Sequence, residues 1–335
     1  MTSLSGFQML LTLSLTLHGE RAMSSLRDLI RRSRRVGVIA AVACGVCFAS
    51  SEPAFAAQQV FPSTAAAAKA LIEAAQKDDL NALESILSSD AKEVISSGDP
   101  VADNNARDTL VAKYKEMHRV AYDDRGRVIL YIGADNWPFP IPMVKEGDGW
   151  VFDTAAGKEE LLFRRVGQNE LYTIDVLKDL ADAQKEYASE GRDGNVKQFA
   201  QKIQSEPGKH DGLYWSVAAG EPESPIGPLI ADATEQGYKT GAGTPIPFHG
   251  YYYRVLTRQG ENAPGGAMDY TDQGKMTKGF AFLAYPASYR ASGVMTFMIN
   301  KDGVIVQKDL GPETPKLAKE ISEFNPDKTW DQDID

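Results

Sequence analysis

Two histidines and one aspartate are the residues of this chain whose chemistry suits proton transfer. His210 precedes Asp211 in the run PGKHDG, and His249 stands in the run FHGYYY. Imidazole titrates near neutral pH, and a carboxylate that bonds one ring nitrogen orients the other toward a substrate. His210, Asp211 and His249 are therefore the candidate catalytic residues, provided that the fold brings them together. Structural hydrogen bonding is the simpler role, because the chain contains no HExxH motif or paired histidine spacing.

Oxygen-bearing side chains at nearby positions make a candidate calcium site around residues 190–195. Glu190 precedes the sequence GRDGN, which contains Asp193 and Asn195. Loops of this kind hold calcium through carboxylate and amide oxygens. Arg192 brings a cation where another oxygen would serve, so a solvated turn at the end of a helix is the alternative interpretation. We expect no other metal or cofactor.

The sequence contains no motif for cysteine, serine-hydrolase or phosphate-binding chemistry in the expected mature chain. Cys44 and Cys47 are the only cysteines, and both fall in the segment that we expect to be removed on export. The mature chain would then have no disulfide, cysteine nucleophile or thiolate metal site. A GxSxG elbow is missing, and the glycine-rich run at 263–267 precedes no Lys-Ser or Lys-Thr pair. These observations favour a protein that is not an enzyme, and the question stays open.

Residues 1–56 have the composition of a secretory signal peptide. Five arginines between residues 27 and 35 precede an apolar run over 36–49, and the residues at 54–56 suit cleavage after Ala56. The run is shorter than the roughly 20 residues of a membrane span, so no transmembrane anchor is expected after cleavage. Met23 stands at a usual distance before the arginines, which makes residues 1–22 an over-long start in one interpretation. Lipidation at Cys44 is a weaker alternative.

Export and charge together limit the partners. We expect the protein to be periplasmic or secreted. The formal net charge is −10, and removal of the arginine-rich leader makes it more negative. A chain this acidic is not expected to bind nucleic acid or an anionic membrane surface.

An N-terminal α+β domain is expected over residues 57–166. Helical periodicity covers 64–118, and short β-type runs follow between 128 and 152. Helices against a bent antiparallel sheet would leave a concave mouth. Such a mouth suits a small apolar ligand, and its candidate lining residues are Trp137, Phe139, Met143, Trp150 and Phe152.

A second domain is expected over residues 167–335. Its first element, GQNELYTIDVLKDLADAQKEYASE (167–190), carries apolar side chains over roughly 200° of the helix, which is wider than one buried face. A shorter helix at 158–165 precedes it without a flexible linker. Four β-type runs follow and predict an antiparallel sheet covered by the long helix: 250–257, 279–285, 293–300 and 303–308.

The first of these strands carries an aromatic surface. Side chains alternate across a strand, so Tyr252 and Arg254 share one face of the run GYYYRV. Aromatic residues with arginine are typical of recognition surfaces, which makes these two residues candidate binding residues. Burial of this face inside the protein is the alternative.

Several long segments resemble one bacterial family. These segments are WPFPIPMVKEGDGWVFDTAAGKEELLFRRVGQNE (137–170), DAQKEYASEGRDGN (182–195), PGKHDGLYW (207–215), SPIGPLIADA (224–233), HGYYYRVLTRQGENAPGGAMDY (249–270), GFAFLAYPASY (279–289) and SGVMTFMINKDGVIVQKDLG (292–311). The sequence resembles the DUF2950 family, whose members have no established activity. The resemblance covers nearly the whole mature chain and implies secretion and this architecture, but no catalytic residues.

Two further resemblances concern the separate units. The N-terminal unit is similar to the NTF2-like cone fold. The long helix and its sheet are similar to the globular part of type IV pilins and pseudopilins. The apolar half-helix that builds a pilus filament is missing here, because a whole domain precedes the helix, so polymerisation is not expected.

Three functional hypotheses follow from these observations. The first is an exported, non-enzymatic envelope protein that acts as a protein-interaction or structural module. The second is a periplasmic small-ligand-binding or hydrolytic protein that uses the N-terminal mouth. The third is an accessory of pilus or secretion assembly. The first hypothesis implies another envelope protein as the partner.

Overall fold

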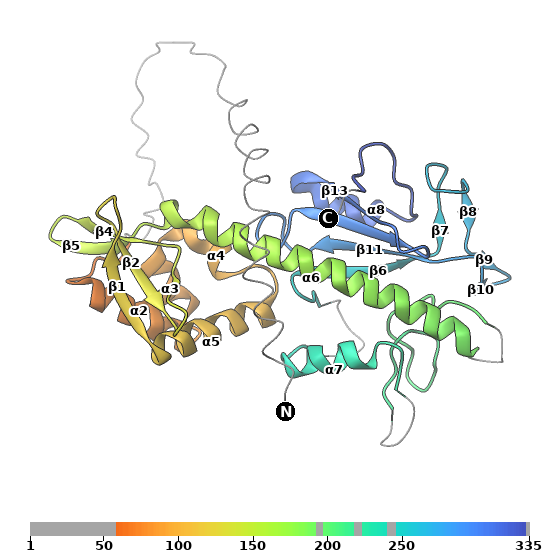
Figure 1. Ribbon diagram of the computed structural model, residues 1–335, viewed down its shortest axis with the longest axis horizontal. Helices are drawn as coiled ribbons and strands as arrows, with labels where there is room; N and C mark the ends of the chain where they lie inside the picture. The colour runs from red at the N-terminus through yellow and green to blue at the C-terminus, as the bar shows by residue number, and fades with distance from the viewer. Residues whose placement is uncertain (1–57, 192–196, 218–222, 240–245, 333–335) are drawn as a thin grey trace, which may run out of the picture. The chain divides into compact units, whose positions relative to one another are not determined.

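The computed structural model describes residues 58–191, 197–217, 223–239 and 246–332, which combine helices with antiparallel sheets in an α+β fold (Figure 1). They all belong to one compact unit, which runs from Ala54 to Asp335. The predicted leader, with Cys44 and Cys47, lies outside the described residues. Among the described helices, none is long and apolar enough to cross a bilayer.

The N-terminal half begins with helices whose starts are capped by side chains. These elements are α2 (Thr64–Gln76), α3 (Leu80–Leu87), the 3-10 turn η1 (Ser89–Ala91), α4 (Lys92–Ile95) and α5 (Pro100–Glu116). The hydroxyl oxygen of Ser63 accepts a hydrogen bond from the Ala66 N–H, and the carboxylate of Asp79 accepts one from the Ala82 N–H. Both bonds satisfy amides that have no partner within the helix. The buried face of α2 is mostly alanine, which allows close packing against α3 and α5.

An antiparallel sheet packs against these helices. It contains β1 (His118–Tyr122), β2 (Val128–Ile132), β4 (Met143–Glu146) and β5 (Gly149–Phe152) in the order β1-β2-β4-β5, and β3 (Trp137–Pro138) pairs with β2. Side chains of β2 alternate between buried and partly buried, as a sheet covered on one face requires. The core between sheet and helices includes Leu71, Leu130 and Ile141, each at most 1 % exposed.

A single helix, α6 (Thr154–Glu190), connects the two halves of the described chain (Figure 1). The sequence predicted two helices, at 158–165 and 167–190, whereas the structure continues the helix through Gly167. Leu161 and Leu162 pack against the N-terminal core. From Thr173 onward the buried side chains of α6 belong to the C-terminal half. The predicted domain boundary at 166/167 therefore falls inside α6, and the division into two domains stays a prediction.

The C-terminal half contains the predicted four-stranded antiparallel sheet. Its strands are β6 (Tyr251–Leu256), β11 (Ala281–Pro286), β12 (Met295–Asn300) and β13 (Ile305–Asp309), in the order β13-β12-β11-β6. Between β6 and β11 the chain forms four short strands: β7 (Arg258–Gln259), β8 (Met268–Asp269), β9 (Thr271–Asp272) and β10 (Lys275–Met276). The turn η2 (Gly311–Glu313) and helix α8 (Thr314–Glu320) follow β13.

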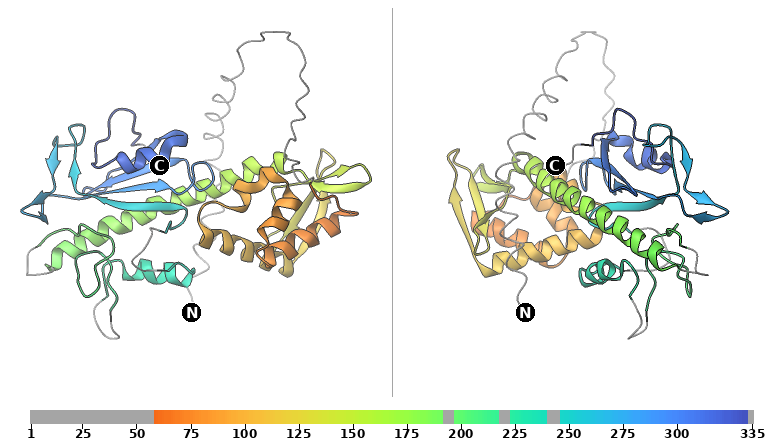
Figure 2. Two further views of the ribbon diagram at one scale, coloured as in Figure 1. Left: turned by 180° about the vertical axis from the view of Figure 1, so that it is seen from behind. Right: turned by 45° about the vertical axis from the view of Figure 1, so that its right-hand side comes forward.

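Helices cover both faces of this sheet (Figure 2). Tyr253 of β6 donates a hydrogen bond from its hydroxyl to Oγ1 of Thr173 on α6, at 3.3 Å. The next residue, Arg254, donates from Nη2 to the Ala318 carbonyl oxygen on α8, at 2.8 Å. Because neighbouring side chains of a strand point to opposite faces, α6 and α8 lie on opposite sides of the sheet. Strand β6 remains at the sheet edge, beside α7 (Gly227–Glu235).

Candidate binding site

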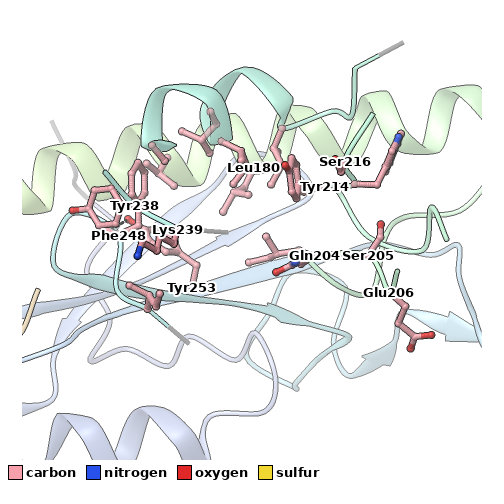
Figure 3. A pocket seen from close by; sticks show the side chains of 18 of the residues that line it. Leu180, Gln204, Ser205, Glu206, Tyr214, Ser216, Tyr238, Lys239, Phe248 and Tyr253 are labelled. Atoms are coloured by element: carbon pink, nitrogen blue, oxygen red, sulfur yellow. Dashed lines mark hydrogen bonds between the residues drawn. The ribbon is translucent and has the colours of Figure 1, made fainter. Parts of the chain in front are cut away.

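A cavity of about 970 Å³ lies between α6, α7 and the edge strand β6 (Figure 3). We call it the α7 cavity. Its volume falls within the range of about 300 to 1,000 Å³ that is typical of ligand sites in proteins. Its lining residues come from segments far apart in the chain: Val176, Leu180, Ile203 to His210, Tyr214 to Ser216, Ile226, Leu229, Ile230, Ala233, Tyr238, Lys239, Ile246 to Phe248, Tyr252 and Tyr253.

Helical spacing produces the apolar walls of the α7 cavity. Val176 and Leu180 lie one turn apart on α6 and are 6 % and 2 % exposed. Leu229 and Ala233 are separated by one turn of α7, and Ile230 lies beside them. Residues four apart share one face of a helix, so each helix presents an aliphatic stripe to the cavity.

A tight turn before β6 places one aromatic ring in the wall. Phe248 and Tyr251 exchange two backbone hydrogen bonds, of 2.8 and 3.1 Å. The two residues between them, His249 and Gly250, have φ angles of +48° and +76°. Positive φ at both central residues is the geometry of a type I′ turn. The turn holds Phe248 against Tyr238, whose ring centroid is 5.0 Å away in an edge-on arrangement.

Two tyrosine hydroxyls give this aromatic end of the cavity its polar groups. Tyr238 donates to the Asp99 carboxylate at 2.8 Å, and Tyr253 donates to Thr173. Burial raises the pKa of both phenols, and the Asp99 charge adds to the rise for each. Both hydroxyls therefore stay protonated at neutral pH and act as hydrogen-bond donors. Lys239 is exposed at this end of the cavity.

An ion-pair cluster stands at the opposite end, where Glu206 and Lys209 line the cavity. Lys202 Nζ lies 2.6 Å from Oε1 of Glu206 and 2.8 Å from Oδ2 of Asp211, and Lys209 pairs with Glu206. The hydrogen bonds from Lys202 and Lys209 lower the pKa of Glu206. The α7 cavity thus has an aliphatic middle between an aromatic end and a charged end.

The family assignment follows from the sequence of the same segments. A family model described as "Protein of unknown function (DUF2950)" matches residues 58–332. The chain belongs to the DUF2950 family. A search of the curated proteins and a search of the solved structures each found no match. The site of this DUF2950 protein must therefore be interpreted from its own geometry.

The predicted catalytic trio of the DUF2950 chain is divided between different partners. His210 lines the α7 cavity, and its ring centroid lies 4.5 Å from that of Trp215. Asp211 accepts bonds from Lys202 Nζ and the Glu206 N–H, at 2.8 and 2.9 Å. The prediction that Asp211 orients a histidine is therefore corrected, because these donors hold its carboxylate.

The third member of the trio, His249, is held by aromatic rings. It stacks on Tyr172 with ring centroids 4.4 Å apart. Burial lowers the pKa of its imidazole, and the Asp99 charge opposes this effect. His249 therefore serves the turn that carries Phe248, and sequence spacing could not reveal this role.

The structure places only one of the three calcium candidates. Glu190 is the last residue of α6, whereas Asp193 and Asn195 lie outside the described residues. Within 58–191, 197–217, 223–239 and 246–332, no group of three or more His, Cys, Asp or Glu side chains is arranged to hold a metal ion. The calcium site stays a prediction.

Three of the five residues expected at an N-terminal mouth lie in the core, and the other two pack against it. Phe139, Met143 and Phe152 are at most 5 % exposed. Phe139 packs edge-on against Phe152, with ring centroids 6.2 Å apart. Trp137 and Trp150 are half-buried against the same core. These side chains fill the space between sheet and helices, which corrects the expectation that they line an open mouth.

The two candidate residues of the aromatic strand differ in their positions. Tyr252 lines the α7 cavity. Nη2 of Arg254 donates to the carbonyl oxygens of Ala318 and Ile321, so it holds the end of α8 rather than a surface ligand. The predicted site residues did not include four that line the α7 cavity, because their convergence depends on long-range packing: Leu229, Ile230, Tyr238 and Phe248. The apolar stripe of α7 was the one local signal that could have indicated them.

Proposed function

We propose that this DUF2950 protein is an exported, non-enzymatic envelope protein that binds an extended apolar segment of another protein in the α7 cavity. The segment would pair with β6 and insert side chains between α6 and α7. Residues 1–56 would act as the signal peptide, which would place the protein in the periplasm or outside the cell. The observation that carries the proposal is the position of the α7 cavity along an edge strand.

The outer edge of β6 offers backbone groups for pairing. Gly250 accepts a bond from Ala287 of the chain segment after β11, whereas Tyr251 pairs outward with Phe248. Strand alternation then turns the N–H and C=O groups of Tyr253 and Val255 outward. Among the described residues, no hydrogen bond is found at these outward groups. An extended polypeptide could use them as a neighbouring strand would, as in strand addition.

Side-chain alternation explains why the cavity suits such a segment. Every second side chain of an added strand points to the same side of the sheet. On the α6 side these side chains would meet Leu180, Ile203 and Phe248, which line the α7 cavity. Backbone pairing would then give affinity, and the aliphatic walls would select large apolar residues.

The finer architecture belongs to the same proposal. We take the N-terminal half to be NTF2-like, because α2, α3 and α5 pack against a bent antiparallel sheet. The C-terminal half would be pilin-like, because a long helix covers a four-stranded antiparallel sheet. In this view the pilin-like unit contributes the edge strand that binds the partner.

Proline substitution at the outer edge tests strand addition. Val255→Pro removes an N–H that makes no bond within the sheet, so the sheet itself should persist. Peptides selected on the wild-type protein from a random twelve-residue library should bind Val255→Pro at least about tenfold more weakly by calorimetry. The matched control is Ile305→Pro, because Ile305 has the same outward orientation on β13, at the opposite sheet edge.

Two comparisons of peptide affinity would contradict strand addition along β6. Equal affinity of wild type and Val255→Pro for the selected peptides would exclude pairing along β6. Equal loss in Val255→Pro and Ile305→Pro would assign the effect to the sheet as a whole. Circular dichroism of both variants establishes that they are folded.

A small apolar molecule is the second candidate ligand, favoured by the size of the α7 cavity. Its volume of about 970 Å³ suits a drug-sized molecule. N-phenyl-1-naphthylamine, a dye that fluoresces in apolar surroundings, would then bind to wild type and to Val255→Pro alike. Leu229→Asp, which puts a charge in the wall, should abolish the signal. Selection of no peptide, together with saturable dye binding, would favour this second candidate.

A further inference from the structure

A buried carboxylate of the N-terminal half reaches the wall of the α7 cavity. Asp99 is 0 % exposed and caps α5, where its Oδ1 accepts from the N–H groups of Val101 and Ala102 at 3.2 and 3.1 Å. Its Oδ2 accepts from the Tyr238 hydroxyl at 2.8 Å and from the Gly250 N–H at 2.9 Å. Four donors and the helix N-terminus thus offset the cost of burying this group.

The two long-range partners of Asp99 lead directly to the cavity wall. Tyr238 lines the cavity, and its hydroxyl oxygen accepts from the His249 N–H at 3.3 Å. Gly250 is the other central residue of the turn that carries Phe248. His249 has a positive φ of +48°, which costs a non-glycine residue free energy, so the turn needs external support. Asp99 supplies that support on both sides of His249. It accepts from the Gly250 N–H directly, and it holds the Tyr238 hydroxyl, which accepts from the His249 N–H.

Other contacts bring α5 to the same place. Nδ2 of Asn105 donates to the Gln236 carbonyl oxygen at 2.9 Å, just beyond the end of α7. A Cβ built on Gly237 would meet the side chain of Val101 at 3.7 Å. The first two turns of α5 therefore lie against residues 236–238, next to Tyr238.

The bonds of Asp99, Tyr238 and Gly250 form one connected group. Its role in ligand binding rests on the proposed function. We propose that Asp99 is a positioning residue of the α7 cavity, which holds Tyr238 and the 248–251 turn in the arrangement that admits a ligand. The N-terminal half is then a part of the binding site although it supplies no lining side chain. Loss of the Asp99 carboxylate should therefore lower the affinity for the ligand more than a change that destabilises α5 and keeps the Asp99 bonds.

Asp99→Asn tests the proposal, because an amide nitrogen cannot accept from the donors that Asp99 serves. N-phenyl-1-naphthylamine should bind to the full-length variant about tenfold more weakly than to wild type. The matched control is Asp103→Asn on the same helix. Asp103 is 7 % exposed and accepts from the Ser97 N–H, with no bond to Tyr238 or Gly250. Its affinity should change less than about threefold.

Two structural readouts separate positioning from general destabilisation. Asp99 raises the pKa of His249 against the effect of burial, so the NMR titration of His249 should move to lower pH in Asp99→Asn and stay unchanged in Asp103→Asn. Hydrogen exchange of the Phe248 and Tyr251 amides should become faster in Asp99→Asn alone. Tyr238→Phe, which removes the hydroxyl's two bonds, to Asp99 and to the His249 N–H, and keeps the ring, provides a milder variant if Asp99→Asn does not fold.

The outcomes distinguish this inference from the proposed function. If wild type binds neither dye nor selected peptides, the proposed function fails, and the exchange of the turn amides still decides whether Asp99 holds the turn. If wild type binds and Asp99→Asn binds equally, with unchanged exchange of Phe248 and Tyr251, positioning by Asp99 is overturned. Equal weakening by Asp99→Asn and Asp103→Asn overturns it as well.

Discussion

Tyr253 of the edge strand β6 donates a hydrogen bond to Thr173 of α6, at a point where the threonine side chain is fully buried. The Thr173 hydroxyl in turn donates to the Asn169 carbonyl oxygen, at 2.8 Å. This short chain of bonds fixes the ring that forms one wall of the α7 cavity. It also joins the sheet to the helix that both halves share.

Thr173→Val should therefore lower the free energy of unfolding. Valine keeps the shape of threonine and removes the nearer acceptor of the Tyr253 hydroxyl, which keeps only the Phe248 carbonyl oxygen at 3.5 Å, so we expect a loss of about 1 to 2 kcal/mol in urea denaturation. Thr234→Val is the control, since Thr234 is exposed on α7 and, within the described part of the chain, its hydroxyl bonds only the Ile230 carbonyl oxygen. Its effect should stay within about 0.5 kcal/mol. Equal effects of the two changes would remove the special role of Thr173.

Leu180→Asp should unfold the two halves together. Leu180 is 2 % exposed in the C-terminal core, and an unpaired charge there costs several kcal/mol. Because α6 also packs against the N-terminal core through Leu161 and Leu162, loss of the helix should expose β2 as well as β12. Hydrogen exchange of both strands measures this.

The control for Leu180→Asp lies on the same helix. Leu171 is 59 % exposed, so Leu171→Asp should leave exchange in β2 and β12 unchanged. If Leu180→Asp opened β12 while β2 kept its protection, the halves would unfold independently, and the helix would not couple them.

Gly157→Ala and Gly167→Ala should have opposite effects on stability although both lie in α6. A Cβ at Gly157 would clash with the Pro140 carbonyl oxygen and lie 2.5 Å from the Ile141 Cα, whereas nothing stands within 4 Å at Gly167. We expect Gly157→Ala to cost about 2 kcal/mol or more. Gly167→Ala should stabilise by about 0.5 to 1 kcal/mol through helix propensity. Thermal denaturation measures both, and a stable Gly157→Ala would contradict the close approach of α6 to the 139–142 loop.

Glu170→Gln should change the dependence of stability on pH. Burial raises the pKa of Glu170 above 4.5, and the N–H groups of Met295 and Val294 oppose the rise. A carboxyl whose folded-state pKa is raised stabilises the fold fully below the unfolded-state pKa, and this contribution is lost as pH rises through the folded-state value. The stability of Glu170→Gln relative to wild type should therefore increase as the pH rises from the ordinary glutamate pKa through the raised folded-state pKa.

Urea denaturation at several pH values measures this difference. Glu160→Gln is the control, because Glu160 is exposed and pairs with Arg164 on the same helix. A difference between Glu170→Gln and wild type that does not vary with pH would show that Glu170 has the same pKa in both states.

The sequence predicted the elements of this fold better than their junctions. The wide apolar arc within residues 167–190 indicated a helix that is buried on more than one side, and Leu177, Leu180 and Tyr187 are buried as expected. The predicted boundary at 166/167 stands beside Gly167, and a glycine costs a helix about 1 kcal/mol. Strong helical sequence on both sides outweighs that cost, so α6 continues.

The candidate site could not be derived in the same way. Its walls come from α6, α7 and the 248–251 turn, and no local pattern relates Leu180, Leu229 and Phe248. The predicted N-terminal lining shows a second limit of local patterns. Phe139 and Phe152 are equally hydrophobic whether their side chains line an opening or fill it, so the sequence alone does not distinguish the two arrangements. Asp211 likewise stands next to His210 in the chain, but Lys202 is its partner in space. Each outcome depends on packing between distant segments.

The unbroken course of α6 also restricts how the chain can vary in length. Leu162 contacts one core and Thr173 the other, and each residue inserted between them turns the second contact surface by about 100° around the helix axis. A single insertion would move Asp179 into the buried position of Leu180 and so direct a charge into the C-terminal core. Seven residues restore the angular phase to within about 20°. Seven residues would still lengthen the helix by about 10 Å and break the bonds of Asp99 to Tyr238 and Gly250, so the spacing between these two contacts should be constant across the family.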